Sequence, residues 1–153
     1  MSLDNMEKRL RLLEDEAAIR SVIQRYGRAV DWLSTEDLDL IFFDDAEIDY
    51  GAFGGAGAEF KQTLQEVEAG FPRRWHFTGS IEIAWVDENT VDVESSQIVG
   101  SATSADLAAD YSLFFGWYLD RLERRNGRWG ISRREGGVSA LSPYSTELLS
   151  RLL

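Results

Sequence analysis

The sequence predicts an α+β fold, in which a curved, mainly antiparallel sheet wraps around helices near the N-terminus. Apolar residues recur at helical spacing early in the chain, and strand-like segments fill the second half. Asn126-Gly127 is a strong two-residue hairpin signal between the last two of these segments. Helices followed by strands indicate α+β rather than a parallel doubly wound sheet. A strongly curved sheet wrapped on one helix can enclose a pocket.

The first helix is predicted over residues 4–30. Its apolar residues are spaced by three and four, and its buried part is surest from Ile19 onward. Gly27 lies near the helix end, where a missing side chain lets another element approach closely or starts the termination. The stripe comprises Leu12, Ile19, Ile23, Tyr26 and Val30.

A second, short helix is predicted to begin at Ser34, which forms a capping box with Asp37, and to end at Asp44-Asp45, a solvated turn. A strand over 46–50 and a loop over 51–57 follow. The loop contains four glycines but lacks the strand-then-helix phosphate pattern, so we expect a flexible lid or a plain loop. The third helix is predicted over 58–69, with Phe60, Leu64 and Val67 inward.

Four strands are predicted over 74–86, 90–100, 113–124 and 128–134, followed by a short helix from Ser142-Pro143. In the first strand the large apolar residues share one parity, and in the third both parities are apolar. The third strand should therefore be covered on both faces, one by the helix and the other by the cavity or a neighbouring subunit. The residues of one parity are Trp75, Phe77, Ile81, Ile83 and Trp85.

The composition fits one domain spanning residues 1–153. The formal net charge of −11 argues against nucleic-acid binding, which needs a basic footprint. The chain has no cysteine, which removes disulfides and thiolate metal sites. A single histidine argues against zinc and leaves magnesium open on composition alone. We expect no metal and no cofactor.

The N-terminal residues 1–16 are charged throughout and carry no apolar core of a secretory signal. The longest charge-free runs have eleven residues, too few to span a bilayer. We therefore expect a cytoplasmic protein that does not enter membranes. Exposed aromatic sheet faces are a liability in a monomer, so a homodimer or homotrimer is expected.

Three stretches together resemble the SnoaL-like branch of the nuclear-transport-factor-two-like superfamily, which has a cystatin-like fold, a cone-shaped α+β barrel. They are residues 18–31, residues 38–51 and residues 119–131, and the segment 75–80 (WHFTGS) adds to them. The resemblance covers most of the chain. It implies a pocket enzyme that acts on a small hydrophobic, often cyclic molecule.

Within that superfamily, scytalone dehydratase and lindane dehydrochlorinase use an aspartate from the first helix and a histidine from the strand after the third helix. Asp31 and His76 occupy the matching places. Tyr50 resembles a tyrosine that orients water or substrate in the dehydratase. The second active-site histidine of that enzyme has no counterpart, because Gln97 or Ser95 lies in its region.

An Asp31–His76 pair could act as a general base, because a carboxylate on one ring nitrogen fixes the tautomer of the other. Tyr26, Tyr50 or Tyr118 could donate a hydrogen bond to a departing oxygen or an enolate. Trp75 and Trp117 are interpreted first as core residues and second as substrate contacts. Arg121 and Arg134 could orient a substrate anion, but we expect them at the surface, solvated or ion-paired. The predicted function is a cofactor-independent lyase or isomerase. The alternatives are a ligand-binding or assembly module, such as the small subunit of a ring-hydroxylating dioxygenase, and a protein-interaction fold without chemistry.

Overall fold

The computed structural model describes residues 2–51 and 53–142. The helices are α1 (Leu3–Asp31), α2 (Thr35–Ile41) and α3 (Gly57–Glu68), and the strands are β1 (Phe42–Asp49), β2 (Gly54–Ala56), β3 (Arg73–Asp87), β4 (Thr90–Ala102), β5 (Ser112–Arg125) and β6 (Arg128–Leu141).

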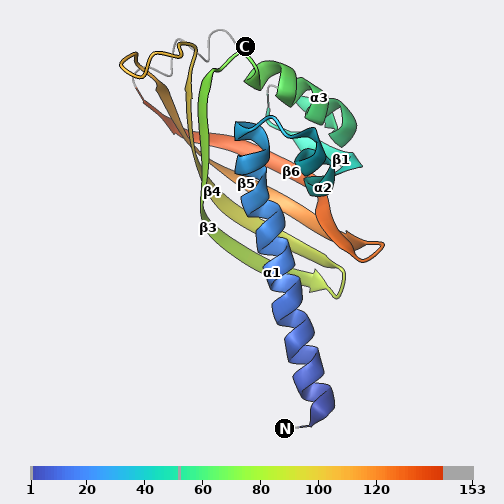
Figure 1. Cartoon of the computed structure of the whole chain (residues 1–153). Helices are drawn as coiled ribbons and strands as arrows, with labels where there is room; N and C mark the ends of the chain where they lie inside the picture. Colours follow the sequence, from blue (N-terminus) through green and yellow to red (C-terminus); the bar gives the residue numbers. More distant parts are fainter. Residues whose placement is uncertain (1, 52, 143–153) are drawn as a thin grey trace.

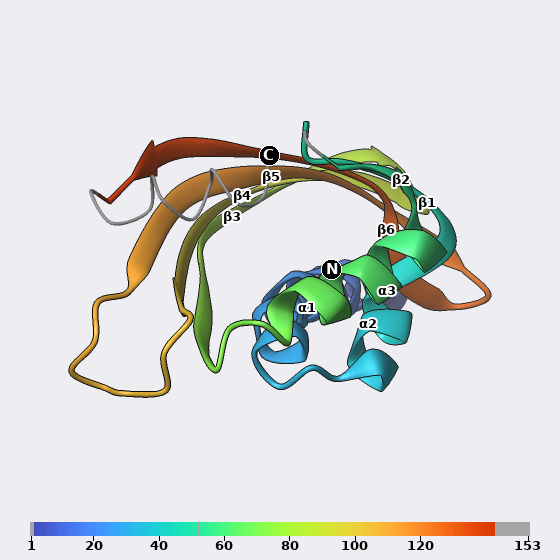
Figure 2. The same cartoon turned by 90° about the horizontal axis from the view of Figure 1, so that it is seen from above.

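One six-stranded sheet, in the order β2-β1-β6-β5-β4-β3, arches over the helices, which all lie on its concave side (Figure 2). Neighbouring strands are antiparallel except β1 and β6, which run parallel. The end strands β2 and β3 do not pair within the described residues, so the sheet is curved without closing into a barrel. The predicted α+β class with a curved, mainly antiparallel sheet is confirmed.

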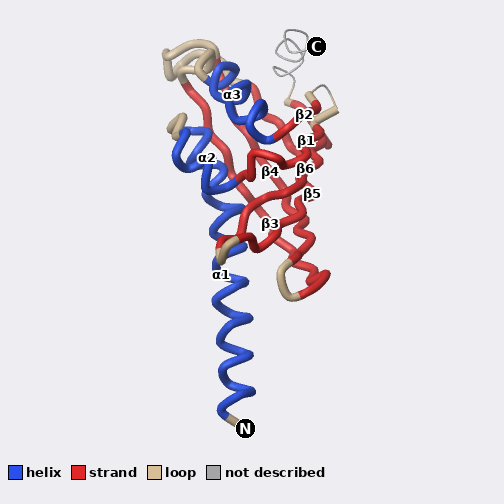
Figure 3. The backbone as a smooth tube through the Cα atoms, turned by 90° about the vertical axis from the view of Figure 1, so that its right-hand side faces the viewer, coloured by secondary structure: helices blue, strands red, loops and turns tan. Residues whose placement is uncertain are grey.

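Helix α1 is buried only in its C-terminal half. Ile19 and Ile23 are fully buried, whereas Leu12 is 48% exposed. The N-terminal turns project beyond the sheet, as Figures 1 and 3 both show. The apolar stripe therefore joins the core from Ile19 onward, as predicted. No helix of the described residues is long and apolar enough to cross a membrane.

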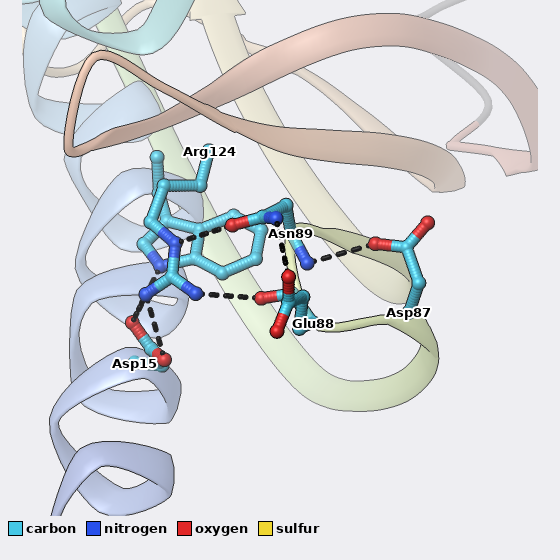
Figure 4. Close-up of polar contacts among 6 residues, drawn as sticks. Asp15, Asp87, Glu88, Asn89 and Arg124 are labelled. Atoms are coloured by element: carbon cyan, nitrogen blue, oxygen red, sulfur yellow. Dashed lines mark hydrogen bonds and ion pairs between the residues drawn. The ribbon is translucent and has the colours of Figure 1, made fainter.

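Polar contacts fasten α1 to the sheet at its midpoint (Figure 4). The guanidinium of Arg124 on β5 donates to both carboxylate oxygens of Asp15, at 2.8 and 3.0 Å. It also donates to the Asn89 side chain and to the Glu88 carbonyl in the turn between β3 and β4. The Trp129 indole N–H donates to the same aspartate at 2.9 Å. These contacts orient α1 along the concave face.

The chain enters the sheet earlier than predicted. β1 begins at Phe42, so Asp44 and Asp45 are strand residues rather than the turn that ends α2. Each aspartate forms an ion pair, Asp44 with Lys61 and Asp45 with Arg125. The glycine-rich loop is also partly a strand, because residues 54–56 pair with β1.

The hairpin between β5 and β6 is confirmed. Asn126 and Gly127 have φ values of 52° and 77°, the left-handed pair that a two-residue turn of this type requires. β6 runs on to Leu141, seven residues beyond its predicted end. The predicted helix from Ser142-Pro143 falls outside the described residues apart from Ser142.

Candidate functional site

Asp31 and His76 lie side by side although they are far apart in the sequence. Asp31 is the last residue of α1, and His76 lies near the start of β3. One carboxylate oxygen is 2.8 Å from His76 Nδ1, and the other accepts the His76 backbone N–H at 3.2 Å. An ionised carboxylate only accepts hydrogen bonds, so Nδ1 carries the proton and Nε2 is left as the basic nitrogen.

Gly27 makes this pairing possible. A Cβ at residue 27 would lie 2.9 Å from the His76 carbonyl oxygen and 3.3 Å from the His76 Cβ. Any side chain here would push β3 away from α1, one turn before Asp31. The missing side chain therefore serves close approach, the first of the two roles considered for this glycine.

The His76 ring lines a cavity of about 470 Å³ between α3 and the concave face of the sheet. Its walls are mainly apolar and aromatic, with a few polar groups, the composition expected of a small-molecule site. Predicted site residues in the lining are His76, Tyr26, Tyr50, Tyr118, Gln97 and Trp117.

Three tyrosines form one wall. Tyr26 and Tyr50 bring their hydroxyl oxygens to 3.5 Å, and the Tyr118 ring meets both of the other rings edge-on at 5.6 Å. Burial raises the pKa of Tyr26 and of Tyr118 well above the ordinary value. These two phenols stay protonated and can act as hydrogen-bond donors across the physiological pH range.

Gln97, not Ser95, reaches the cavity. Its carbonyl oxygen accepts from Thr78 at 3.0 Å, and its amide donates to the buried Ser95 hydroxyl at 3.0 Å. These two contacts hold the Gln97 side chain in place between β3 and Ser95.

Trp75 does not line the cavity. It lies on the opposite face of β3 from His76, is 49% exposed and stacks on Phe77. Trp75 is therefore not a core residue, contrary to its first interpretation, and it makes no contact in this cavity, contrary to its second. Strand alternation explains this, because neighbours in a strand point to opposite faces.

Arg134 is fully buried, contrary to the expected surface position. It forms a bidentate ion pair with Asp120, at 2.6 and 2.7 Å, and its guanidinium lies over the Tyr118 and Tyr26 rings. The expected ion pairing is correct and the expected exposure is not. This pair supports the tyrosine wall from behind. Arg121 is exposed and pairs with Asp92, as expected.

Several lining residues were not singled out from the sequence. Gly136 and Gly137 leave room for rings, because a Cβ there would lie 2.7 Å from Tyr50 and 2.4 Å from Trp117. Glu68, at the end of α3, also lines the cavity. In the sequence, Glu68 looks like an ordinary surface residue, because it is an acid that follows the apolar stripe of α3. Only the folded structure places it against the cavity. In the part of the chain that the structure describes, no three acidic or histidine side chains are grouped to hold a metal ion.

Comparison with solved structures shows the same fold. A putative scytalone dehydratase from Novosphingobium aromaticivorans is 25% identical with a TM-score of 0.77, over 86% of this chain and 89% of that one. A hexachlorocyclohexane dehydrochlorinase, LinA-type3 from Novosphingobium barchaimii, is 23% identical with a TM-score of 0.77, over 88% of this chain and 92% of that one.

Sequence comparison finds mycobacterial relatives and a match to a protein-family model. The uncharacterised proteins Mb2934c of Mycobacterium bovis and Rv2910c of Mycobacterium tuberculosis are each 34% identical over 128 residues, 80% of this chain and 84% of theirs. The model of the SnoaL-like domain matches residues 11–135. The chain therefore belongs to the SnoaL-like family.

Proposed function

We propose that this protein is a cofactor-independent lyase or isomerase that acts on a small hydrophobic, cyclic substrate. The observation that carries the proposal is the 2.8 Å contact between Asp31 and His76, of which His76 lines an aromatic cavity and Asp31 lies outside the lining. Solved structures of the same fold include proteins described as a putative scytalone dehydratase and a hexachlorocyclohexane dehydrochlorinase. Both descriptions name elimination reactions, in which a proton is removed from a carbon atom of the substrate.

In the proposed reaction, His76 Nε2 takes a proton from a carbon of the substrate. Asp31 holds the ring in the tautomer that leaves Nε2 basic and stabilises the imidazolium that forms. Tyr50 donates a hydrogen bond to the oxygen on which charge develops, and Tyr26 supports it at 3.5 Å. Gln97 and Tyr118 orient the substrate, since they line the same cavity.

The cavity favours this proposal over an assembly subunit. A subunit that serves only to pack against a large partner would be expected to fill its cone with side chains. Here a space of about 470 Å³ remains beside the ionisable pair, large enough for a small organic molecule.

The test is an elimination assay with a panel of cyclic and aryl ketones that carry hydroxyl or chlorine on the carbon β to the carbonyl. Product formation is followed by the absorbance of the conjugated enone. We expect turnover of at least one compound, and a loss of about 10²–10⁴-fold in kcat/KM for His76→Ala. No turnover of the whole panel, or equal rates for the variant, would overturn the proposal.

A further inference from the structure

Glu68 is a carboxylate with no partner of its own in the cavity. It is the last residue of α3 and lines the same cavity as His76. Its Oε2 atom is buried and has no hydrogen-bond partner among the described residues. Buried polar atoms are normally hydrogen-bonded, so an unpaired one in a ligand-sized cavity points to a partner that arrives with a ligand.

A structural role does not account for this side chain. An acid in the last turn of a helix is disfavoured by the helix dipole. The nearby cation, Arg74, uses its guanidinium on backbone carbonyls, those of Val30, Glu68 and Phe71. Arg74 thus ties the ends of α1 and α3 together, and it forms no ion pair with the Glu68 carboxylate.

The surroundings favour the protonated carboxyl. Burial raises the pKa of Glu68, and the neighbouring Asp31 charge raises it further, while His76 and Arg74 lower it. Burial is the largest of these effects, so the net direction is upward. These three groups are the charges that act on Glu68 from α1 and β3. A carboxyl held neutral in an apolar site can donate a hydrogen bond.

We propose that Glu68 is a second proton-transfer group of this site, whose protonated carboxyl binds an oxygen of the substrate and acts as its general acid. The inference rests on the proposed function above and narrows its substrate class. In the elimination, His76 takes the proton from carbon, the C–O bond breaks, and the Glu68 proton joins the leaving oxygen to give water. Solvent then carries the proton from His76 back to Glu68. A halide leaves without a proton, so this arrangement suits a β-hydroxy carbonyl compound.

The first experiment compares two probes of equal shape, 2-acetylnaphthalene and 2-isopropenylnaphthalene, which differ in a C=O against a C=CH₂. Binding is followed by isothermal titration calorimetry. One net hydrogen bond should make the ketone bind roughly threefold to tenfold more tightly. The part of this advantage that Glu68 supplies should be lost as the pH rises through the Glu68 titration.

Variants separate the carboxyl from its neighbours. Glu68→Leu should remove the part of the ketone's advantage that changes with pH and leave any part that Tyr50 supplies, whereas Glu68→Gln should keep the advantage at every pH, because an amide always donates. Glu66→Leu, on the exposed side of α3, is the matched control and should behave like the wild type.

The elimination assay tests the acid itself. Because an amide cannot release a proton, Glu68→Gln should slow loss of hydroxide about 10²-fold and change loss of chloride by less than about twofold. A ketone advantage that does not change with pH in the wild type, or whose change with pH survives Glu68→Leu, overturns the role of Glu68 alone. Failure of both probes to bind removes the cavity as a ligand site, and the proposed function falls with it.

Discussion

The Asp31 carboxylate makes both of its hydrogen bonds to one residue, the ring and the backbone N–H of His76. Asp31→Asn keeps the shape but offers only one accepting oxygen, so the amide nitrogen that replaces the other oxygen donates to Nδ1 and leaves the ring proton on Nε2, the wrong tautomer for a base. We expect a loss of about 10²–10⁴-fold in kcat/KM on any substrate the wild type turns over. ¹⁵N NMR of the His76 ring should show the Nδ1–H tautomer in the wild type and its loss in the variant. An unchanged tautomer would contradict this assignment.

Glu68 should make the stability of the fold depend on pH. Its folded-state pKa is raised, chiefly by burial, so its contribution is present below the ordinary glutamate pKa and is lost as the pH rises through the folded value. Glu68→Gln removes this loss. Between the unfolded-state and folded-state pKa of Glu68, the variant should therefore become more stable relative to the wild type as the pH rises. The gain in the free energy of unfolding should be about 1.4 kcal/mol for each unit by which the two pKa values differ. Denaturant unfolding at a series of pH values measures it.

The exposed Glu66→Gln is the control for that series and should give a flat difference. A flat difference for Glu68→Gln as well would mean that the Glu68 carboxyl is solvated. That result would also remove the basis for a protonated carboxyl in the cavity.

At the scale of elements, the three described helices and the β5–β6 turn are predicted well, whereas the turn at Asp44-Asp45 and the faces of β3 are not. The start of the buried part of α1, the cap at Ser34 and the hairpin at Asn126-Gly127 could be predicted, because each depends on residues close together in the sequence. The start of β1 was missed because Phe42 continues the apolar spacing of α2, and only pairing with Ile131 on β6 shows it to be a strand residue.

Which residues of β3 face the cavity depends on a β-bulge that no sequence pattern predicts. The pairing shifts between Thr78, opposite Gln97, and Ile81, opposite Ser95, so three steps on β3 match two on β4. This extra residue reverses the alternation. Trp75 and Phe77 therefore point outward while Ile81 packs in the core, although all three share one parity in the sequence. The bulge thus places His76 inward and Trp75 outward.

Contact between elements at Gly27 should be sensitive to a single methyl group. Gly27→Ala places a Cβ about 2.9 Å from the backbone oxygen of His76, which cannot rotate away. Overpacking costs about 1–3 kcal/mol, against a gain of at most about 1 kcal/mol in helix propensity. We expect a net loss in the free energy of unfolding, measured by denaturant titration, and a weaker Asp31–His76 contact by NMR.

Gly54→Ala is the matched control, because its new Cβ would meet only an ordinary contact at 3.7 Å. Equal stability of Gly27→Ala and the wild type would show that β3 can shift without cost. The dependence of the His76 position on Gly27 would then be refuted.

For the whole molecule, the open sheet leaves its two faces in different situations. The concave face is covered by helices and encloses the cavity, whereas no described element covers the convex face (Figure 2). An apolar row crosses four strands on that convex face, through the pairs Phe77–Ile98, Ile98–Phe115 and Phe115–Ala140. Phe77 is 50% exposed and Phe115 39% exposed. Contiguous exposed apolar surface of this kind marks an interaction site.

We therefore expect a homodimer or homotrimer that buries this row. Sedimentation velocity should give two or three times the 17.3 kDa mass of the chain. Phe77→Lys combined with Phe115→Lys should shift the protein to monomer, because two buried charges without partners oppose association. Leu107→Lys, in the loop between β4 and β5, is the control, since its side chain is 86% exposed and lies outside the row. A monomeric wild type would refute the expectation. If the Phe77→Lys, Phe115→Lys double variant still forms the oligomer, the interface lies elsewhere, and the projecting N-terminal end of α1 is the next surface to change.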